Sequence, residues 1–234
     1  MHPESAFFFI DSNQAVTVKD AGTREYIEEV ASAYVHETID LPRLDTQFRV
    51  LGGDAYLHRI RMILGYPGES EDLVPIRHYD FRVFDSPCKM REELRRLNGI
   101  YGKTRMVSGY VCDWKSEDGS NQYDITLEGG KFLARWNLKK KSDYEYSWLF
   151  DDSSFEEVGC IHTCQGLDME YCGVIIGNDM RYENGEIIFD QTKIADTDKS
   201  SGIKKCNPEL AEKLIRNTYN VLLSRGMRGT FVYC

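Results

Sequence analysis

The chain has 234 residues, of which 41% are hydrophobic, enough for one sizeable core or for a core with an inserted subdomain. Its formal net charge of -9 argues against a surface that binds nucleic acid by bulk attraction, but a local basic stripe is compatible with it, so charge neither supports nor excludes a nucleic-acid partner. No apolar run approaches the roughly 20 residues needed to cross a bilayer, and the first residues lack the features of a signal peptide, so we expect a cytoplasmic protein.

Strands and helices are predicted to alternate from the start of the chain. Residues 6–10 form an apolar run that ends at Asp11, which predicts a buried strand. Residues 22–38 carry apolar side chains on one stripe and acidic ones outside it, which predicts a helix. A short strand or extended segment at 44–50 and a short helix at 53–64 follow.

A strand, a helix and another strand are predicted next. Residues 79–84 alternate as a strand, and residues 104–111 form a second one. Between them, residues 87–98 form a helix that Ser86 opens with Pro87 in its first turn. This order is typical of a parallel sheet with helical crossovers.

The texture of the sequence changes between residues 112 and 156, where aromatic side chains stand among Gly, Ser and charged residues without clear periodicity. We predict a loop-rich insertion there. Its tryptophans and tyrosines could stack on single-stranded bases, but such residues more often hold an irregular subdomain together, and we favour that core role. The three lysines at 139–141 form either a solvated turn or a segment that tracks a phosphate backbone.

The alternating pattern resumes after the insertion. Strands are predicted at 157–163, 171–176 and 229–233, with a hairpin-like piece near 187–189. Residues 190–205 are polar and are predicted to form a mobile surface loop. Residues 208–223 form a long helix for which Asn207 is the expected cap. The predicted fold class is α/β, with a parallel sheet and helices on both of its faces.

The cysteines form no regular framework, and we expect them to be reduced thiols. They lie at positions 88, 112, 160, 164, 172, 206 and 234. Cys160, His162 and Cys164 could share one face of an extended strand, but no second pair of ligands follows at zinc spacing. We therefore predict no metal site.

No complete catalytic motif is present in the sequence. The GKT at 102–104 lacks a glycine at P-loop spacing and lies between a helix and a strand, so we interpret it as a turn. A G-x-S-x-G elbow and an HExxH motif are also absent. The most informative segment is 160–177, where a polar Thr-x-Gln-Gly turn separates two apolar runs and is suited to presenting its backbone to a ligand.

Four segments resemble motifs of one family. FFFIDSNQAVTVKDAG looks like its motif III, LDTQFRVLGGDAYL like motif IV, TCQGLDMEYCGVIIG like motif V and NTYNVLLSRGMRGTFVY like motif VI. In this order they resemble the second half of the Schlafen group 3-like DNA/RNA helicase domain, a family related to superfamily I helicases. The resemblance implies a RecA-like lobe over residues 1–234, truncated at its N-terminus, with the insertion at 112–156.

The resemblance implies roles for seven residues. Gln14 would sense the γ-phosphate of a nucleotide, and Arg49 and Arg225 would approach the phosphates from across a cleft between two lobes. A guanidinium suits that task because it stays charged and offers a planar fork of donors. The structural alternatives are a turn cap for Gln14 and ordinary surface or salt-bridged positions for the two arginines.

In motif V, Gly166 would let the backbone approach a ligand, Thr163 would contact the nucleic-acid backbone, and Gln165 and Asp168 would link that contact to the nucleotide. The family usually has Glu where this chain has Asp168, whose side chain is one methylene shorter. Thr163 could instead be a strand-end residue bonded to its own backbone, and Asp168 could cap a short helix after Gly166.

The resemblance therefore implies the C-terminal lobe of a helicase or nucleic-acid-dependent ATPase, with single-stranded DNA or RNA as its expected partner. ATP and Mg²⁺ are expected only together with a first lobe that supplies the P-loop, in cis or in trans, and the chain alone is expected to be inactive. The alternative is a non-catalytic nucleic-acid-binding or protein-interaction module.

Overall fold

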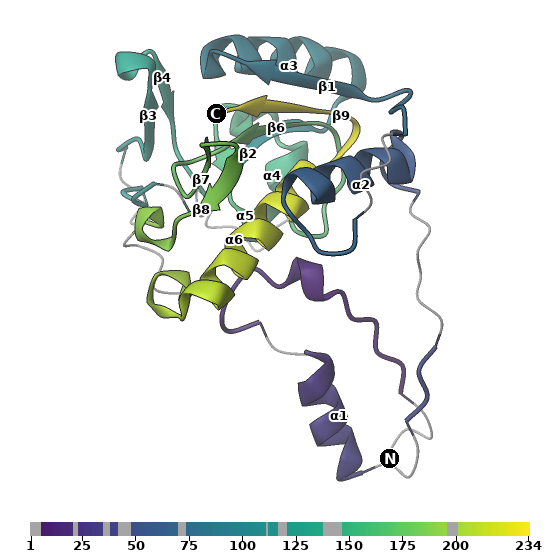
Figure 1. Cartoon of the computed structure of the whole chain (residues 1–234). Coiled ribbons are helices and arrows are strands. Elements are labelled where there is room, and N and C mark those ends of the chain that lie inside the picture. The colour runs from purple at the N-terminus through teal and green to yellow at the C-terminus, as the bar shows by residue number, and fades with distance from the viewer. Residues whose placement is uncertain are drawn as a thin grey trace.

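The computed structural model describes residues 6–20, 23–34, 38–41, 48–69, 74–110, 112–116, 121–137, 147–195 and 201–234. Its centre is a parallel sheet in the strand order β1-β9-β6-β2-β5 (Figure 1). These strands span Asp80–Phe84 (β1), Thr104–Ser108 (β2), Val158–Gly159 (β5), Met169–Ile175 (β6) and Gly226–Tyr233 (β9). The predicted α/β class is confirmed, and the arrangement is consistent with a RecA-like fold.

Helices cover both faces of the sheet. Helix α3 (Pro87–Tyr101) lies on one face and buries Met90, Leu94 and Leu97 against it. Gly173 permits this close packing, since a Cβ atom there would lie 2.4 Å from Cδ1 of Leu94. The opposite face holds α5 (Ile161–Cys164) and α6 (Pro208–Leu223), with α2 (Gly53–Ile63) beside α6 (Figure 1).

The predicted caps explain where the two long helices begin. The Ser86 hydroxyl accepts a hydrogen bond from the Lys89 N–H at 3.3 Å, and the Asn207 side chain accepts one from the Leu210 N–H at 2.8 Å. Each cap satisfies an N–H group that has no partner within its helix. The segment at 102–104 is the predicted helix-to-strand turn, with Gly102 at φ +71° after the end of α3.

The described part of the 112–156 region packs as a small satellite of the sheet. It holds the hairpin of β3 (Ile125–Leu127) and β4 (Phe132–Ala134) and the short helix α4 (Ser147–Phe150). Trp136 and Trp148 are buried, and Trp114 meets Trp136 edge-on at 5.8 Å. The core role favoured for these tryptophans is confirmed, whereas the lysines at 139–141 lie outside the described residues.

Two stretches after the satellite differ from the expectation. The predicted strand at 157–163 ends at Gly159, and the helix α5 follows, because the Cys160 thiol accepts from the Thr163 N–H and caps a helical turn. The described parts of 190–205 are packed 3-10 turns rather than a mobile loop, since Ile194, Ser201 and Ile203 are buried. The predicted hairpin is present as β7 (Met180–Glu183) and β8 (Glu186–Phe189).

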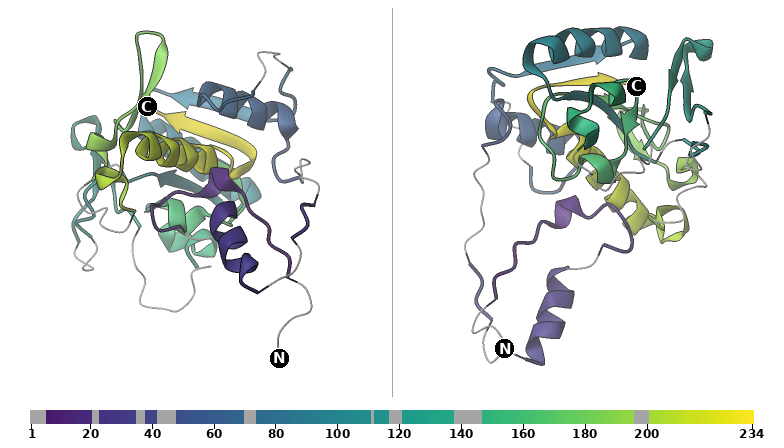
Figure 2. Two further views of the ribbon diagram at one scale, coloured as in Figure 1. Left: turned by 60° about the horizontal axis from the view of Figure 1, so that its bottom comes forward. Right: turned by 180° about the vertical axis from the view of Figure 1, so that it is seen from behind.

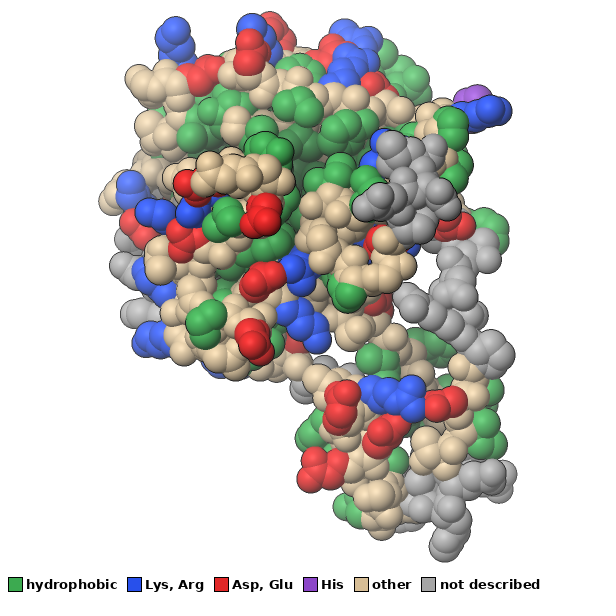
Figure 3. Space-filling model, viewed as in Figure 1, with side chains coloured by type: hydrophobic (Ala, Val, Ile, Leu, Met, Phe, Trp, Pro, Cys, Tyr) green, Lys and Arg blue, Asp and Glu red, His purple; other side chains and the backbone are tan. Residues whose placement is uncertain are grey.

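The N-terminal part of the chain projects from the body of the domain as an arm, which we define as residues 6–11 and 23–41 as far as described (Figures 1, 2 and 3). It includes α1 (Arg24–Ser32), shorter than the helix predicted at 22–38. The buried strand predicted at 6–10 is wrong: the segment pairs with no strand of the described chain, and Phe7, Phe8 and Phe9 are 72%, 63% and 84% exposed. The apolar side chains of residues 6–10 predicted burial, but no other part of the described chain covers them.

The arm joins the body through residues 12–18. A 3-10 turn, Ser12–Gln14, packs against α6, and the following Val16 is fully buried. The predicted extended segment at 44–50 lies mostly outside the described residues, and Phe48 to Val50 form no strand.

Among the residues that the structure describes, no helix has the length and hydropathy to cross a membrane.

Candidate functional site

Residues from motifs IV, V and VI meet at the amino-terminal edge of the sheet. Asp168 directly precedes β6 and Arg225 directly precedes β9, and the Met169 N–H donates to the Arg225 carbonyl at 3.1 Å. The Leu51 N–H donates to the Met227 carbonyl at 2.8 Å, which fixes the end of motif IV beside the start of β9. Single α/β domains usually bind ligands at the opposite, carboxyl edge.

Arg49 and Asp168 form an ion pair across this edge. Nε of Arg49 lies 2.5 Å from Oδ1 of Asp168, and the two side chains are 39% and 46% exposed. An ion pair with this much solvent contact contributes little to folding, about 0.2–1 kcal/mol. The alternative role considered for Asp168, the cap of a short helix after Gly166, is wrong. Asp168 is instead the ion-pair partner of Arg49, a candidate phosphate-binding residue.

Arg225 is buried beside this pair, with 3% of its surface exposed. Its hydrogen bonds go to neutral oxygens, from Nε to the Val221 carbonyl at 3.0 Å and from Nη2 to the Ser224 hydroxyl at 3.4 Å. Burial lowers the pKa of Arg225, and the positive charge of Arg49 lowers it further, while Asp168 acts in the opposite direction. A guanidinium has five N–H donors, and these bonds use two of them.

Gln14 of motif III is linked to motif V. Its carbonyl accepts a hydrogen bond from Nε2 of Gln165 at 3.1 Å. Its own side chain is exposed and donates from Nε2 to Oδ2 of Asp11 at 2.8 Å, so it does stabilise a turn, as the structural alternative proposed. The Asp11 carboxylate also accepts from the Asn13 N–H at 3.0 Å and thereby caps the 3-10 turn.

The loop between α5 and β6 turns at Gly166, which has φ +86° with no atom within 4 Å of where a Cβ would lie. Thr163 is bonded to a residue of the satellite rather than to Arg49 or Arg225. It lies in α5 rather than at a strand end, and its hydroxyl donates to Oδ1 of Asn137, in the satellite, at 3.0 Å.

The two cysteines and the histidine at 160–164 have other partners. His162 shares a hydrogen bond with the Tyr110 hydroxyl, and the Cys164 thiol donates to the Ile161 carbonyl. Burial raises the pKa of both the Cys160 and the Cys164 thiol. The described residues hold no cluster of three or more His, Cys, Asp or Glu placed to bind a metal ion, and all seven cysteines are unpaired.

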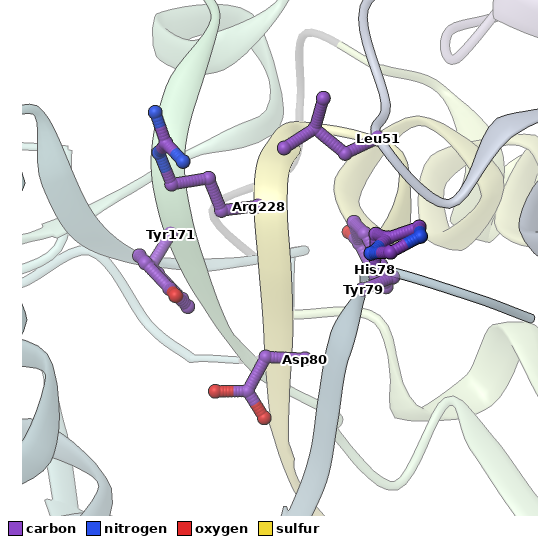
Figure 4. A pocket seen from close by; sticks show the side chains of 6 residues that line it. All are labelled: Leu51, His78, Tyr79, Asp80, Tyr171 and Arg228. Carbon is purple, nitrogen blue, oxygen red and sulfur yellow. The ribbon is translucent and has the colours of Figure 1, made fainter.

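A shallow depression of about 390 Å³ lies beside the starts of β1 and β9 (Figure 4). It is lined by Leu51, His78, Tyr79, Asp80, Tyr171 and Arg228. Arg228 is held by Glu170, with Nε 2.6 Å from Oε2, and its guanidinium lies 4.8 Å from the Tyr101 ring centroid. The lining is polar and aromatic, and it extends the charged edge beyond Arg49 and Arg225.

Six of the seven predicted residues thus gather in two linked groups. Arg49, Asp168 and Arg225 form one group, and Gln14 and Gln165 form the other, with Gly166 in the loop between Gln165 and Asp168. Thr163 stands apart with Asn137, which the sequence analysis did not identify.

Sequence reasoning also missed Asn217. Its side chain binds the 3-10 turn Ser12–Gln14, called the Gln14 turn below, to α6. The available signal was a polar side chain on the apolar stripe of a predicted helix.

Comparisons with known proteins show the family to which the chain belongs. The chain is 32% identical over 162 residues to an uncharacterized protein of Saccharomyces cerevisiae, and the match covers 68% of this chain and 35% of the yeast protein. The matched part is therefore about a third of the yeast protein's length. No solved structure matches the chain. The model of the Schlafen group 3, DNA/RNA helicase domain matches residues 4–234, and the chain belongs to that family.

Proposed function

We propose that this chain forms the second RecA-like lobe of a superfamily I type DNA/RNA helicase or nucleic-acid-dependent ATPase. The observation that carries the proposal is the convergence of motifs IV, V and VI on one edge of the sheet, with motif III hydrogen-bonded to motif V. Arg49, Asp168 and Arg225 meet there, and Gln165 ties the same loop to Gln14.

The two arginines are suited to bind the phosphates of a nucleotide held by another lobe. Arg225 is held by the backbone of its own helix and needs little rearrangement to present its remaining donors, which is the condition for electrostatic stabilisation of a transition state. Arg49 is paired with Asp168, and a phosphate group would replace that carboxylate as its partner. An arginine that reaches the transferred phosphoryl group contributes about 10³ to 10⁵ in rate.

Contact with nucleic acid would be coupled to this site through one short segment. Thr163 and Gln165 lie two residues apart at the end of α5, where Thr163 faces Asn137 and Gln165 holds the Gln14 turn. A strand of DNA or RNA bound at Thr163 would thereby shift the same loop that positions Gln165, Gly166 and Asp168. Single-stranded nucleic acid is the expected partner, and the face of the molecule seen in Figure 3 carries mixed positive and negative charges.

ATP and Mg²⁺ would be bound together with a P-loop-bearing first lobe, because residues 1–234 contain no P-loop sequence. The arm is suited to dock that lobe. Its run of Phe7, Phe8, Phe9 and Ile10 exposes apolar side chains on both sides of the chain, and contiguous exposed apolar surface of this kind marks an interaction site. The chain alone should then be inactive.

The test compares hydrolysis by the chain alone with hydrolysis by a protein that joins it to a P-loop-bearing RecA-like lobe. We expect no magnesium-dependent ATP turnover by the chain alone, and turnover that single-stranded DNA or RNA stimulates in the joined protein. Robust hydrolysis by the chain alone would contradict the proposal. Nucleic-acid binding without any turnover in the joined protein would instead favour a non-catalytic binding module.

A further inference from the structure

Asn217 is a polar side chain in the apolar face of α6. It has no exposed surface, and its neighbours one turn away, Leu214 and Val221, are also buried. A buried amide is costly unless its donors and its acceptor are all bonded, so its presence among apolar residues calls for specific partners.

Three hydrogen bonds satisfy the Asn217 amide. Nδ2 donates to the Ser12 carbonyl at 3.0 Å and to the Ala15 carbonyl at 2.8 Å, and Oδ1 accepts from the Tyr66 hydroxyl at 2.6 Å. Both amide hydrogens are directed at backbone carbonyls that flank Gln14. The exposed Gln14 turn is thus fastened from inside the core.

The partners of Asn217 lie on segments that carry the candidate site. The Ser12–Gln14 turn belongs to motif III, and Tyr66 follows α2, the helix that motif IV leads into. The neighbouring Arg216 reinforces this joint, with Nε donating to the Leu64 carbonyl at 2.9 Å. Helix α6 itself ends directly before Ser224 and Arg225. One buried amide in motif VI therefore connects motif III with the segment that follows helix α2.

We propose that Asn217 is a positioning residue that sets the separation of Gln14 and Arg225, so that both reach the same nucleotide phosphate. It touches no nucleotide itself. The inference rests on the proposed function, in which Gln14 and Arg225 act on one nucleotide. A shift of α6 would move Arg225 and, through Asn217, the Gln14 turn together.

The first test needs no nucleotide. Hydrogen–deuterium exchange of the isolated chain reports on the Gln14 N–H, which is bonded to the Asp11 carbonyl. In Asn217→Ala we expect exchange across residues 12–16 to accelerate about tenfold, since two net hydrogen bonds to the turn are lost. Asn98→Ala is the matched control, because its Oδ1 accepts from the Thr104 N–H and from Arg105 on the far side of the sheet. It should leave residues 12–16 unchanged.

The second test uses the protein joined to a P-loop-bearing lobe. Asn217→Ala should lower kcat about tenfold with KM nearly unchanged, and the decrease should vanish when Gln14 is already Ala. Tyr66→Phe, which removes a single bond, should give a smaller decrease and serves if Asn217→Ala does not fold. A purely structural Asn217 would give additive effects in the double variant, and that result overturns the inference.

The two possible failures are distinguishable. Absence of hydrolysis by the unsubstituted joined protein overturns the proposed function and the positioning role with it. Hydrolysis with an unchanged kcat in Asn217→Ala overturns the positioning role alone, and unchanged exchange at residues 12–16 does so without reference to nucleotide.

Discussion

Arg225 is a buried charge that makes only two side-chain hydrogen bonds, and the chain contains a second buried arginine for comparison. Arg105 is also buried, but its guanidinium makes five hydrogen bonds. They go to the carbonyls of Trp148, Thr104 and Asp151, to the Ser154 hydroxyl and to Oδ1 of Asn98. Arg225 makes two, to Val221 and Ser224.

The two arginines should therefore respond differently to replacement by methionine, which keeps the apolar stem. Hydrogen bonds to a charged group are worth about 1.5 kcal/mol or more each, so Arg105→Met loses about 7.5 kcal/mol of bonds and recovers a desolvation penalty of several kcal/mol. It should destabilise the domain by about 4 kcal/mol and leave buried acceptors unpaired. Arg225→Met loses about 3 kcal/mol of bonds but recovers a desolvation penalty of several kcal/mol. Its stability should change by less than about 1 kcal/mol.

Urea unfolding of the isolated chain measures both changes as shifts of the midpoint at constant slope. A buried arginine with few hydrogen bonds destabilises the fold, so its presence indicates a functional role. An Arg225→Met variant that is as stable as the unsubstituted chain, but has lost ATP hydrolysis in the joined protein, would support that role. Equal destabilisation by Arg225→Met and Arg105→Met would refute the reasoning, because Arg225 would then be a structural arginine.

Three further outcomes are expected. Because Phe7 and Phe9 are more than two-thirds exposed, we expect the isolated chain to self-associate with rising concentration in light scattering. Replacing both by serine should abolish this association. Association of the variant at the same strength would contradict a role for the arm. Burial raises the pKa of Asp179 to about 6. The folded state then binds more protons than the unfolded one between pH 4 and 6, so unfolding free energy should fall by roughly 3 kcal/mol as pH rises through that range, and Asp179→Asn should lack that slope. Gly166→Ala should lower the unfolding free energy by about 1–2 kcal/mol, because Gly166 has a left-handed backbone. Gly173→Ala should lower it more, because its Cβ would lie 2.4 Å from Cδ1 of Leu94. A larger loss for Gly166→Ala in chemical denaturation would count against both explanations.

Local signals in the sequence predict much of the central fold. The Ser86 and Asn207 caps mark the starts of α3 and α6, and the apolar run after the 165–166 turn lies in the sheet as β6. The order of the strands was not predictable, because neighbouring strands such as β1 and β9 pair residues from opposite ends of the described sheet region.

The family resemblance named seven residues, six of which lie in the two linked groups of the candidate site, but the contacts between them were not predictable. The ion pair between Arg49 and Asp168 and the bonds of Asn217 join segments that are distant in sequence, and nothing local names their partners. The strand predicted at 6–10 failed for a related reason. An apolar run indicates that burial is favourable, but it does not identify the surface that buries it.

The most direct measurement of the central claim is single-turnover ATP hydrolysis by this chain joined to a P-loop-bearing lobe, with Arg225→Ala compared to Arg96→Ala. Arg96 is an exposed arginine of α3 that pairs with Glu93, away from the candidate site. The account predicts that Arg225→Ala lowers the rate about 10³-fold or more while nucleotide affinity stays within a few-fold, and that Arg96→Ala changes neither. Equal rates for the two variants would contradict it.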